Sequence, residues 1–244
     1  MNCKVMGIVN VTPDSFSDGG QFFKPEEAIR RAKNLISDGA DIIDLGGEST
    51  RPGATPIGWE EEWDRIKPVL GKVADLGALV SVDTYHPETA AKAITAGAHI
   101  INCVYADPIP EMLKLLVDND VELVMPAKCF ETFASASRRD ADGTASRLYL
   151  DPMIGFNTTR EEDIDLLRSI PELVKKGRVL VGASRKRIVK KLIGEKSSVG
   201  KNIGGNVAIA VWAAMQGASV VRVHDVKETV QALRVVDALG EGER

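Results

Sequence analysis

The feature that most constrains this chain is the regular alternation of short, β-branched runs with longer helical patterns. This alternation is typical of βα units that build a parallel sheet. Several of the runs are almost continuously apolar, as expected where helices cover one face and a packed interior the other. The pattern predicts eight strands, near Val5–Asn10, Ile42–Leu45, Leu79–Asp83, His99–Asn102, Glu122–Met125, Leu148–Leu150, Val179–Gly182 and Val220–Val223. Eight units in 244 residues predict an α/β fold, a single (β/α)8 barrel domain over residues 1–244.

The segments between the strands predict the surrounding helices. They are Pro25–Ser37, Gly58–Asp75, Pro87–Ala96, Ile109–Asp118, Glu161–Lys175, a split pair at Lys186–Ile193 and Asn202–Gln216, and Val226–Leu239. Pro68 and Pro171 fall inside two of these segments, where proline should kink or break the helix. Residues 126–147 turn small and polar after Phe133, which leaves room only for a short helix near Lys128–Ser137. We therefore expect the fifth crossover helix to be short or missing.

Composition excludes several classes of partner. The formal net charge is −4, so no strong field draws the chain to nucleic acid or to an anionic membrane. No apolar run approaches the roughly 18 residues that a spanning helix needs, and the first residues lack a signal-peptide layout. Cys3, Cys103 and Cys129 are too few and too scattered for a metal site or a disulfide framework. We expect a cytoplasmic protein with no nucleic-acid or membrane partner.

Polar side chains stand at the end of nearly every predicted strand. In barrels of this kind the active site lies at the carboxyl ends of the strands. The residues that fall there are Asn10, Asp83, Asn102, Asp151, Ser184, Lys186, Arg222 and His224, and the loops at 12–20 and 49–55 are rich enough in glycine and proline to act as mobile lids. Strand ends in a purely structural barrel would need only turn residues, so the pattern predicts an enzyme.

The residue types at this rim indicate the chemistry. Two acids and an amide, Asp83, Asn102 and Asp151, suit a flat heterocycle with adjacent N–H donors and one acceptor, such as an aminopyrimidinone. Lys186 can bond a ring carbonyl or nitrogen, and the planar guanidinium of Arg222 can stack on a ring or bind an anion. Asn10, Arg222 and His224 could bind a phosphate group, with the help of Mg²⁺ if that ion is present.

Structural roles stay open for several of these residues. Asp83 and Asp151 could cap helices or anchor loops, and His224 could be a buried, hydrogen-bonded histidine. Lys186 and Arg185 could be surface charges at a helix start, although cations there oppose the helix dipole. We interpret His86 and His99 as structural, and Trp59 and Trp63 as packing residues in the core or at an interface.

Several motifs carry a resemblance to a known family. Residues 6–20 (MGIVNVTPDSFSDGG) and 43–53 (IDLGGESTRPG) resemble the two signatures of the dihydropteroate synthases. Ser81-Val82-Asp83-Thr84, Gly182-Ala183-Ser184-Arg185-Lys186 and Arg222-Val223-His224-Asp225-Val226 are similar to later blocks of that family. The resemblance covers almost the whole chain. It implies a cytoplasmic transferase of folate biosynthesis that condenses 6-hydroxymethyl-7,8-dihydropterin pyrophosphate with p-aminobenzoate and is a sulfonamide target.

The resemblance also implies a role for each residue. Pterin would be bound by Asp83, Asn102, Met125, Asp151, Lys186 and Arg222, and pyrophosphate by Asn10, Arg222 and His224, with Asn10 also touching Mg²⁺. The p-aminobenzoate site would use Thr50, Arg51, Pro52, Phe156 and Ser184, together with Lys186. Catalysis would rest on Lys186, Arg222, His224 and Asp83. The implied assembly is a homodimer.

The chain departs from the family pattern at three places near the site. Cys103 follows the strand-four asparagine where the family usually has aspartate, Met125-Pro126-Ala127 replaces Met-His-Met, and Asn157-Thr158 replaces a glycine-lysine pair. Two alternatives therefore stay open beside an active synthase. One is a pterin-binding paralogue with little synthase activity. The other is a related pterin-dependent methyltransferase that docks a corrinoid protein.

Overall fold

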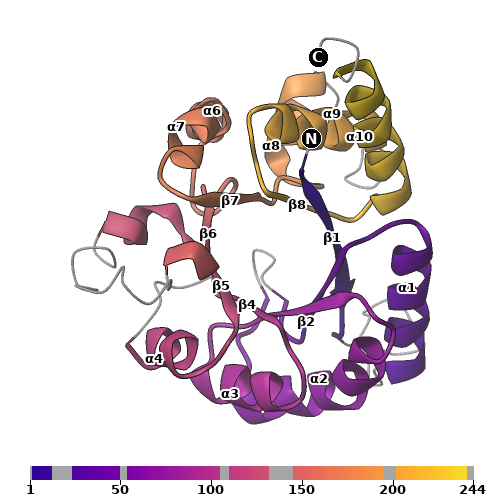
Figure 1. Cartoon of the computed structure of the whole chain (residues 1–244), viewed down its shortest axis with the longest axis vertical. Helices are drawn as coiled ribbons and strands as arrows, with labels where there is room; N and C mark the ends of the chain where they lie inside the picture. The colour runs from indigo at the N-terminus through magenta and orange to yellow at the C-terminus, as the bar shows by residue number, and fades with distance from the viewer. Residues whose placement is uncertain are drawn as a thin grey trace.

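The computed structural model describes residues 2–12, 24–49, 54–104, 110–131, 145–194 and 202–240. Its centre is a closed barrel in which the strands follow one another in chain order, from β1 round to β8 and back to β1 (Figure 1). Every neighbouring pair is parallel. The strands are β1 (Lys4–Asn10), β2 (Ile42–Gly46), β3 (Leu79–Asp83), β4 (Ile100–Asn102), β5 (Glu122–Pro126), β6 (Leu148–Asp151), β7 (Arg178–Val181) and β8 (Val220–Val223). The predicted (β/α)8 barrel is confirmed.

Helices form an outer ring around the strands, as Figure 1 shows. They are α1 (Pro25–Ser37), α2 (Trp59–Ala74), α3 (Pro87–Thr95), α4 (Pro110–Asp118), α6 (Arg160–Arg168), α7 (Ile170–Val174), α8 (Arg187–Ile193), α9 (Ile203–Met215) and α10 (Val226–Gly240), with 3-10 turns at Ala127–Cys129 and Ala145–Arg147. Local chemistry explains their starts: proline opens α1 and α3, and Thr159 and Glu162 form a capping box at α6. No helix in these ranges is long and apolar enough to cross a bilayer.

Two apolar clusters fill the molecule, one on each side of the barrel wall. The outer layer lies between strands and helices and includes Val9, Leu45, Val82, Leu123 and Val181. The inner cluster fills the barrel bore and consists of Met6, Ile42, Ile100, Val104, Val124, Tyr149, Leu180 and Val220. Because successive strand residues point to opposite faces, this division fixes which side chains can reach the bore.

The two internal prolines behave differently. Pro171 lies in the first turn of α7 and separates it from α6, so the break expected there is confirmed. The helix α2 runs through Pro68 without a break, so of the kink or break expected there the break does not occur. Its flanking residues Ile66, Val69 and Leu70 are fully buried, and this packing outweighs the one backbone hydrogen bond that proline removes.

The fifth crossover contains residues 132–144, which fall outside the described ranges, so a short or missing helix there stays a prediction. Arg147 joins the end of this crossover to the end of α4. Its guanidinium donates to the carbonyl oxygens of Leu116 and Asn119. His99 accepts a hydrogen bond from the backbone N–H of Val80, which confirms its structural interpretation. Trp63 packs against the outer layer as expected.

Candidate active site

The polar residues at the carboxyl ends of the strands point into the bore because of the strand register. Asp83 pairs with Gly46 on one side and Asn102 on the other, and the pleat then directs Asp83 and Asn102 inward, above the apolar inner cluster. Asp151 on β6 and Arg222 on β8 also face the bore, because Leu150 and Val221 beside them lie in the outer layer. Residues from four strands that are far apart in the sequence therefore meet at one mouth of the barrel.

Arg222 lies at the centre of this arrangement. Its side chain leaves β8 and crosses the bore, where Nε donates to Asp44 Oδ2 at 2.6 Å and Nη2 donates to Asp83 Oδ2 at 2.7 Å. Burial alone would lower the pKa of Arg222, but the two carboxylates outweigh burial and raise it. Burial also raises the pKa of Asp83 to about 7, although the charge of Arg222 opposes that shift. The guanidinium is fixed as a permanent cation at the mouth of the barrel.

Asp44 is a member of the site that the sequence reasoning missed. It is fully buried on β2, and Asn102 Nδ2 donates to the same Oδ2 atom at 3.3 Å. The sequence did contain a signal for Asp44. An acid inside the apolar run Ile42–Leu45 is costly to bury without a partner, as is Asn102 inside the apolar run of β4.

Asp151 is held by the turn that follows it. Its Oδ1 accepts the backbone N–H of Met153 at 2.6 Å, and Met153 has a left-handed φ of 66°. Such a conformation is uncommon for a residue other than glycine and often marks a functional turn. Burial raises the pKa of Asp151, and the charge of Lys186 opposes the shift. A Cβ atom on Gly182 would lie 3.8 Å from Arg222 Cδ and 3.9 Å from Asp151 Oδ2, so these two side chains border one space.

Lys186 reaches the site from the start of α8. Its Nζ donates to the carbonyl oxygen of Ile154 at 2.6 Å and lies 4.2 Å from the centroid of the Phe156 ring. The stem packs over Gly155, where a Cβ atom would come within 2.9 Å of Lys186 Cδ. Burial lowers the pKa of Lys186 to about 8, while Asp151 acts in the opposite sense. Lys186 and Phe156 therefore form one wall beside Asp151.

His224 follows Arg222 on the same inward face. Its Nδ1 lies 3.1 Å from Ser184 Oγ, and its backbone N–H donates to that hydroxyl at 3.3 Å. Burial, together with the charges of Arg185 and Arg222, lowers the pKa of His224 to about 3. The imidazole is therefore neutral and can donate a hydrogen bond to an anion through one ring nitrogen.

Arg185 has a structural role. It has a left-handed φ of 60°, its backbone N–H donates to Asn206 Oδ1 at 2.9 Å, and its Nη2 donates to Asp225 Oδ1 at 2.7 Å. Asn206 Nδ2 in turn donates to Asp225 Oδ2 at 3.0 Å. This triangle fixes the turn that aims Ser184 and Lys186 at the mouth of the barrel, so Arg185 is an exposed charge, as the open alternative had it, that also has a structural role.

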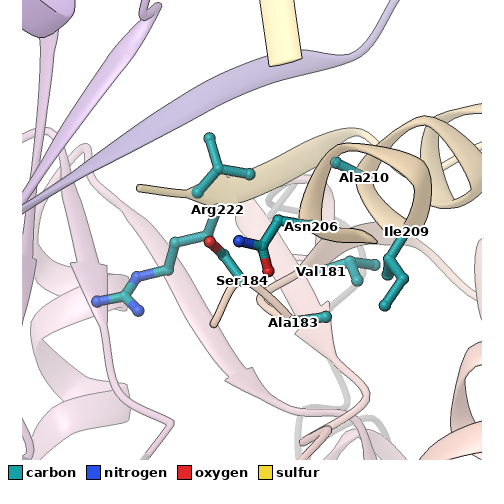
Figure 2. Close-up of a pocket in the computed structure, with 8 residues that line it drawn as sticks. Val181, Ala183, Ser184, Asn206, Ile209, Ala210 and Arg222 are labelled. Carbon is teal, nitrogen blue, oxygen red and sulfur yellow. The ribbon is translucent and has the colours of Figure 1, made fainter. Parts of the chain in front are cut away.

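Figure 2 shows the region behind this turn. A hollow of about 10 Å³ lies between β7, β8 and α9 and is lined by Val181, Ala183, Ser184, Asn206, Ile209, Ala210, Arg222 and Val223. A water molecule needs roughly this volume, so the hollow cannot hold a substrate. In Figure 2 the guanidinium of Arg222 points away from Ile209 and Ala210, toward the bore.

Met125 does not take the place that the sequence suggested. It is buried in the outer layer with Leu123, whereas Val124 between them belongs to the inner cluster. Because strand residues alternate, the next inward residue of β5 is Pro126, which pairs with Asp151. The expectation that Met125 lines the pterin site is therefore wrong, and Val124 and Pro126 carry the inward face of this strand.

The loop after β2 is anchored to its neighbours. Arg65 Nη1 donates to the Gly47 carbonyl oxygen at 2.8 Å, and Tyr85 OH donates to the Glu48 carboxylate at 3.0 Å. Glu62 is fully buried beside Gly47, and Thr84 Oγ1 donates to its Oε2 at 2.7 Å. Thr50, Arg51 and Pro52, the residues expected to contact p-aminobenzoate, lie outside the described ranges, as does most of the first lid loop.

Asn10 ends β1 at the same mouth and is exposed. It pairs with Gly46, and a Cβ atom there would lie 4.0 Å from Asn10 Oδ1, so the amide oxygen lies close to Gly46. Among the described residues no three His, Cys, Asp or Glu side chains gather as a metal site. Mg²⁺ commonly uses one or two protein oxygens and takes its other ligands from water and substrate phosphates. Asn10 fits that manner of binding.

Known proteins share both the sequence pattern and the fold. The family model described as "Pterin binding enzyme" matches residues 6–224. The chain is 36% identical over 256 aligned positions to the dihydropteroate synthase of Staphylococcus haemolyticus, covering 98% of this chain and 96% of that protein. It is similar, with a TM-score of 0.87 and 38% identity, to the Xanthomonas albilineans dihydropteroate synthase solved with 4-aminobenzoic acid, over 98% of this chain and 93% of that one. A structure of the Xanthomonas enzyme with 7,8-dihydropteroate gives a TM-score of 0.83 at 35% identity, over 98% and 94% of the two chains.

Proposed function

This chain belongs to the dihydropteroate synthase family of pterin-binding enzymes, and on that premise we propose that it joins 6-hydroxymethyl-7,8-dihydropterin pyrophosphate to p-aminobenzoate. The bond between the pterin methylene carbon and the diphosphate oxygen breaks. A new bond forms between that carbon and the amine nitrogen, which loses a proton. The products are 7,8-dihydropteroate and pyrophosphate, so the enzyme is a transferase of folate biosynthesis.

One observation carries the proposal: Arg222 joins Asp44 and Asp83 in the bore and borders the same space as Asp151. The buried acids offer acceptors to the N–H groups of a pterin ring, and Lys186 offers a donor. The guanidinium of Arg222 and the neutral ring of His224 can both donate to the diphosphate. Removal of pyrophosphate leaves positive charge on the pterin methylene group, and fixed carboxylates nearby stabilise that charge electrostatically.

The amine would enter beside Phe156 and Ser184, and the expected residues Thr50, Arg51 and Pro52 would complete its site. Phe156 packs against Lys186 at the wall next to Asp151, so an aromatic amine placed there lies close to the pterin methylene group. Positioning of this kind lowers the barrier without a strong base. Sulfonamides resemble the amine and should compete for the same space.

The direct test is pyrophosphate release by the purified protein, with both substrates and Mg²⁺ present. A synthase releases one pyrophosphate for each dihydropteroate formed, and a sulfonamide raises the apparent KM for p-aminobenzoate. Pterin binding without turnover would instead favour the paralogue suggested by Cys103, Pro126 and Asn157. Retention of a corrinoid protein on immobilised enzyme, without turnover, would favour the methyltransferase.

Magnesium would be held by Asn10 together with the diphosphate and water. When bound, the ion would supply charge that neutralises the departing pyrophosphate. Titration of pyrophosphate into the protein with and without Mg²⁺ tests this role. We expect Asn10→Ala to reduce the Mg²⁺ dependence of binding while the affinity for a pterin without diphosphate stays unchanged.

A homodimer would be formed through the apolar surface of the last two helices. Trp212 and Met215 on α9 are 47% and 59% exposed, and Val235 and Leu239 on α10 are 59% and 76% exposed. Since α9 and α10 pack side by side (Figure 1), a second copy that docks on this pair of helices could cover these residues. Light scattering should show a dimer that Trp212→Glu dissociates. Val117→Glu is the matched control, because Val117 is 54% exposed on the distant helix α4.

We also place the protein in the cytoplasm. A reducing compartment suits three cysteines that are too scattered in the sequence for a disulfide framework. Fractionation of cells that express a tagged full-length chain tests this placement.

A further inference from the structure

Arg222 makes two carboxylate contacts that lie at different depths in the barrel. The partner of Nε, Asp44, has a side chain that is 0% exposed, whereas the partner of Nη2, Asp83, is 15% exposed. The register explains the difference. Asp44 pairs with Ser81, and Asp83 comes two residues later on the same strand as Ser81. Two strand residues advance the chain by about 6.6 Å, so Asp44 lies deeper in the bore than Asp83, which lies nearer the rim.

Asp44 is held by Arg222 and Asn102. Its Oδ2 atom accepts from Arg222 Nε and from Asn102 Nδ2, while Oδ1 is buried and has no hydrogen-bond partner in the described part of the chain. An ionised carboxylate this deep is costly unless a cation is paired with it. Arg222 is the cation that the structure places against it, so this lower contact has a reason to persist when a ligand arrives.

Asp83 is placed differently. It stands at the mouth of the barrel, where the proposed pterin must find its hydrogen-bond acceptors. A carboxylate that is tightly paired with an arginine is a poorer acceptor for another donor. The ring and Arg222 Nη2 therefore compete for Asp83. The strength of the contact between Arg222 Nε and Asp44 decides how readily Nη2 releases Asp83 to the ring.

We propose that Asp44 is a positioning residue, which holds Nε of Arg222 so that Asp83 can exchange its contact with Nη2 for the pterin ring. This inference rests on the proposed function. Asp44 itself touches neither the ring nor the diphosphate. It acts through Arg222, keeping the guanidinium extended across the bore in both the ligand-free and the ligand-bound protein.

The test is a double-mutant cycle read by calorimetric titration of pterin pyrophosphate. Asp44→Asn keeps the size of the side chain and an oxygen acceptor but removes the charge, so Arg222 should pair more strongly with Asp83 and weaken pterin binding by about tenfold. The same substitution in an Arg222→Gln background should change the affinity by less than about twofold, because no guanidinium is left to position.

Ser81→Ala is the matched control. Ser81 is fully buried beside Asp44, and no hydrogen bond links its hydroxyl to Arg222. Its removal should leave pterin affinity unchanged. Equal losses from Asp44→Asn in both backgrounds, or no loss in either, would overturn the positioning role. A wild-type protein that binds no pterin would instead contradict the proposed function, so the two failures can be told apart.

A second measurement does not depend on the variants folding. In the wild-type protein labelled with ¹⁵N-arginine, the Nε–H of Arg222 should exchange slowly with water and keep its chemical shift when pterin pyrophosphate is added. The Nη resonances should shift, because that end of the guanidinium changes partner. A large shift or rapid exchange of the Nε–H on binding would contradict a fixed lower contact.

Discussion

The Nζ atom of Lys186 lies 4.2 Å above the ring of Phe156, and it reaches this position although burial disfavours its charge. The aromatic face, the Ile154 carbonyl and the nearby Asp151 stabilise the ammonium, while the loss of water destabilises it. The balance lowers the pKa of Lys186 to about 8, close enough to neutrality for its charge to be lost under mildly alkaline conditions.

Lys186 should therefore set an alkaline limit on activity. A lysine is charged below its pKa, so the ratio kcat/KM for the pterin substrate should fall as the pH rises through about 8. Lys186→Arg keeps its charge to a much higher pH. We expect this variant to be less active, because arginine has a different shape, but to lack the alkaline limb. An identical limb in both proteins would assign the titration to another group.

His224 should contribute through hydrogen bonding rather than through charge. Its pKa of about 3 keeps the imidazole neutral throughout the usual assay range. Replacement by glutamine should lower kcat/KM for pterin pyrophosphate by about 10- to 100-fold, the usual effect of losing a hydrogen bond to a charged group. The shape of the pH profile should stay the same. His99→Gln serves as a control, since His99 lies at the opposite ends of the strands. Loss of a pH-dependent limb in His224→Gln would show that the wild-type imidazole titrates.

Gly47 should tolerate no side chain. A Cβ atom there would lie 2.9 Å from Glu62 Cγ and 3.0 Å from the Glu62 carbonyl oxygen. We expect Gly47→Ala to lower the free energy of unfolding by about 1–3 kcal/mol. The matched control is Gly71→Ala, inside α2, where nothing lies within 4 Å. Alanine should stabilise that helix by about 0.5–1 kcal/mol. Urea denaturation measures both, and effects of the same sign would contradict the close contact at Gly47.

Glu62 should make stability depend on pH. Burial raises its pKa in the folded protein, although Thr84 and Thr89 oppose the shift. A carboxyl group with a raised folded pKa stabilises the fold at low pH, and this contribution is lost as the pH rises through the folded value. Glu62→Gln cannot ionise. Its free energy of unfolding relative to wild type should therefore increase as the pH rises above the ordinary pKa range of a glutamate. A difference that stays constant across this range would show that Glu62 remains in one protonation state.

The barrel itself was predictable because each strand and helix is signalled locally. The strands β3 (Leu79–Asp83) and β8 (Val220–Val223) and the helix α1 (Pro25–Ser37) have the predicted bounds. The failures arise where packing overrides local propensity. Pro68 sits inside α2 because the buried residues on both sides hold the helix together.

The site was predictable in its membership but less so in its contacts. The convergence of Asp83, Asp151, Lys186 and Arg222 follows from placing polar residues at strand ends. Met125 was implied by the resemblance alone, and the resemblance does not show which residue of β5 faces inward; in the structure that face carries Val124 and Pro126. Asp44 was missed because it lies two residues below the strand end.

The crossing of the bore by Arg222 has a consequence for how this protein can change over generations. The groups proposed to hold the pterin are also the groups that fill the upper interior of the barrel, so altering one of them disturbs folding and binding together. A substitution that weakens inhibitor binding costs the least stability where the side chain contacts only the ligand. Selection should therefore find its variants among the loop residues around the amine, while the acids and arginine in the bore stay as they are.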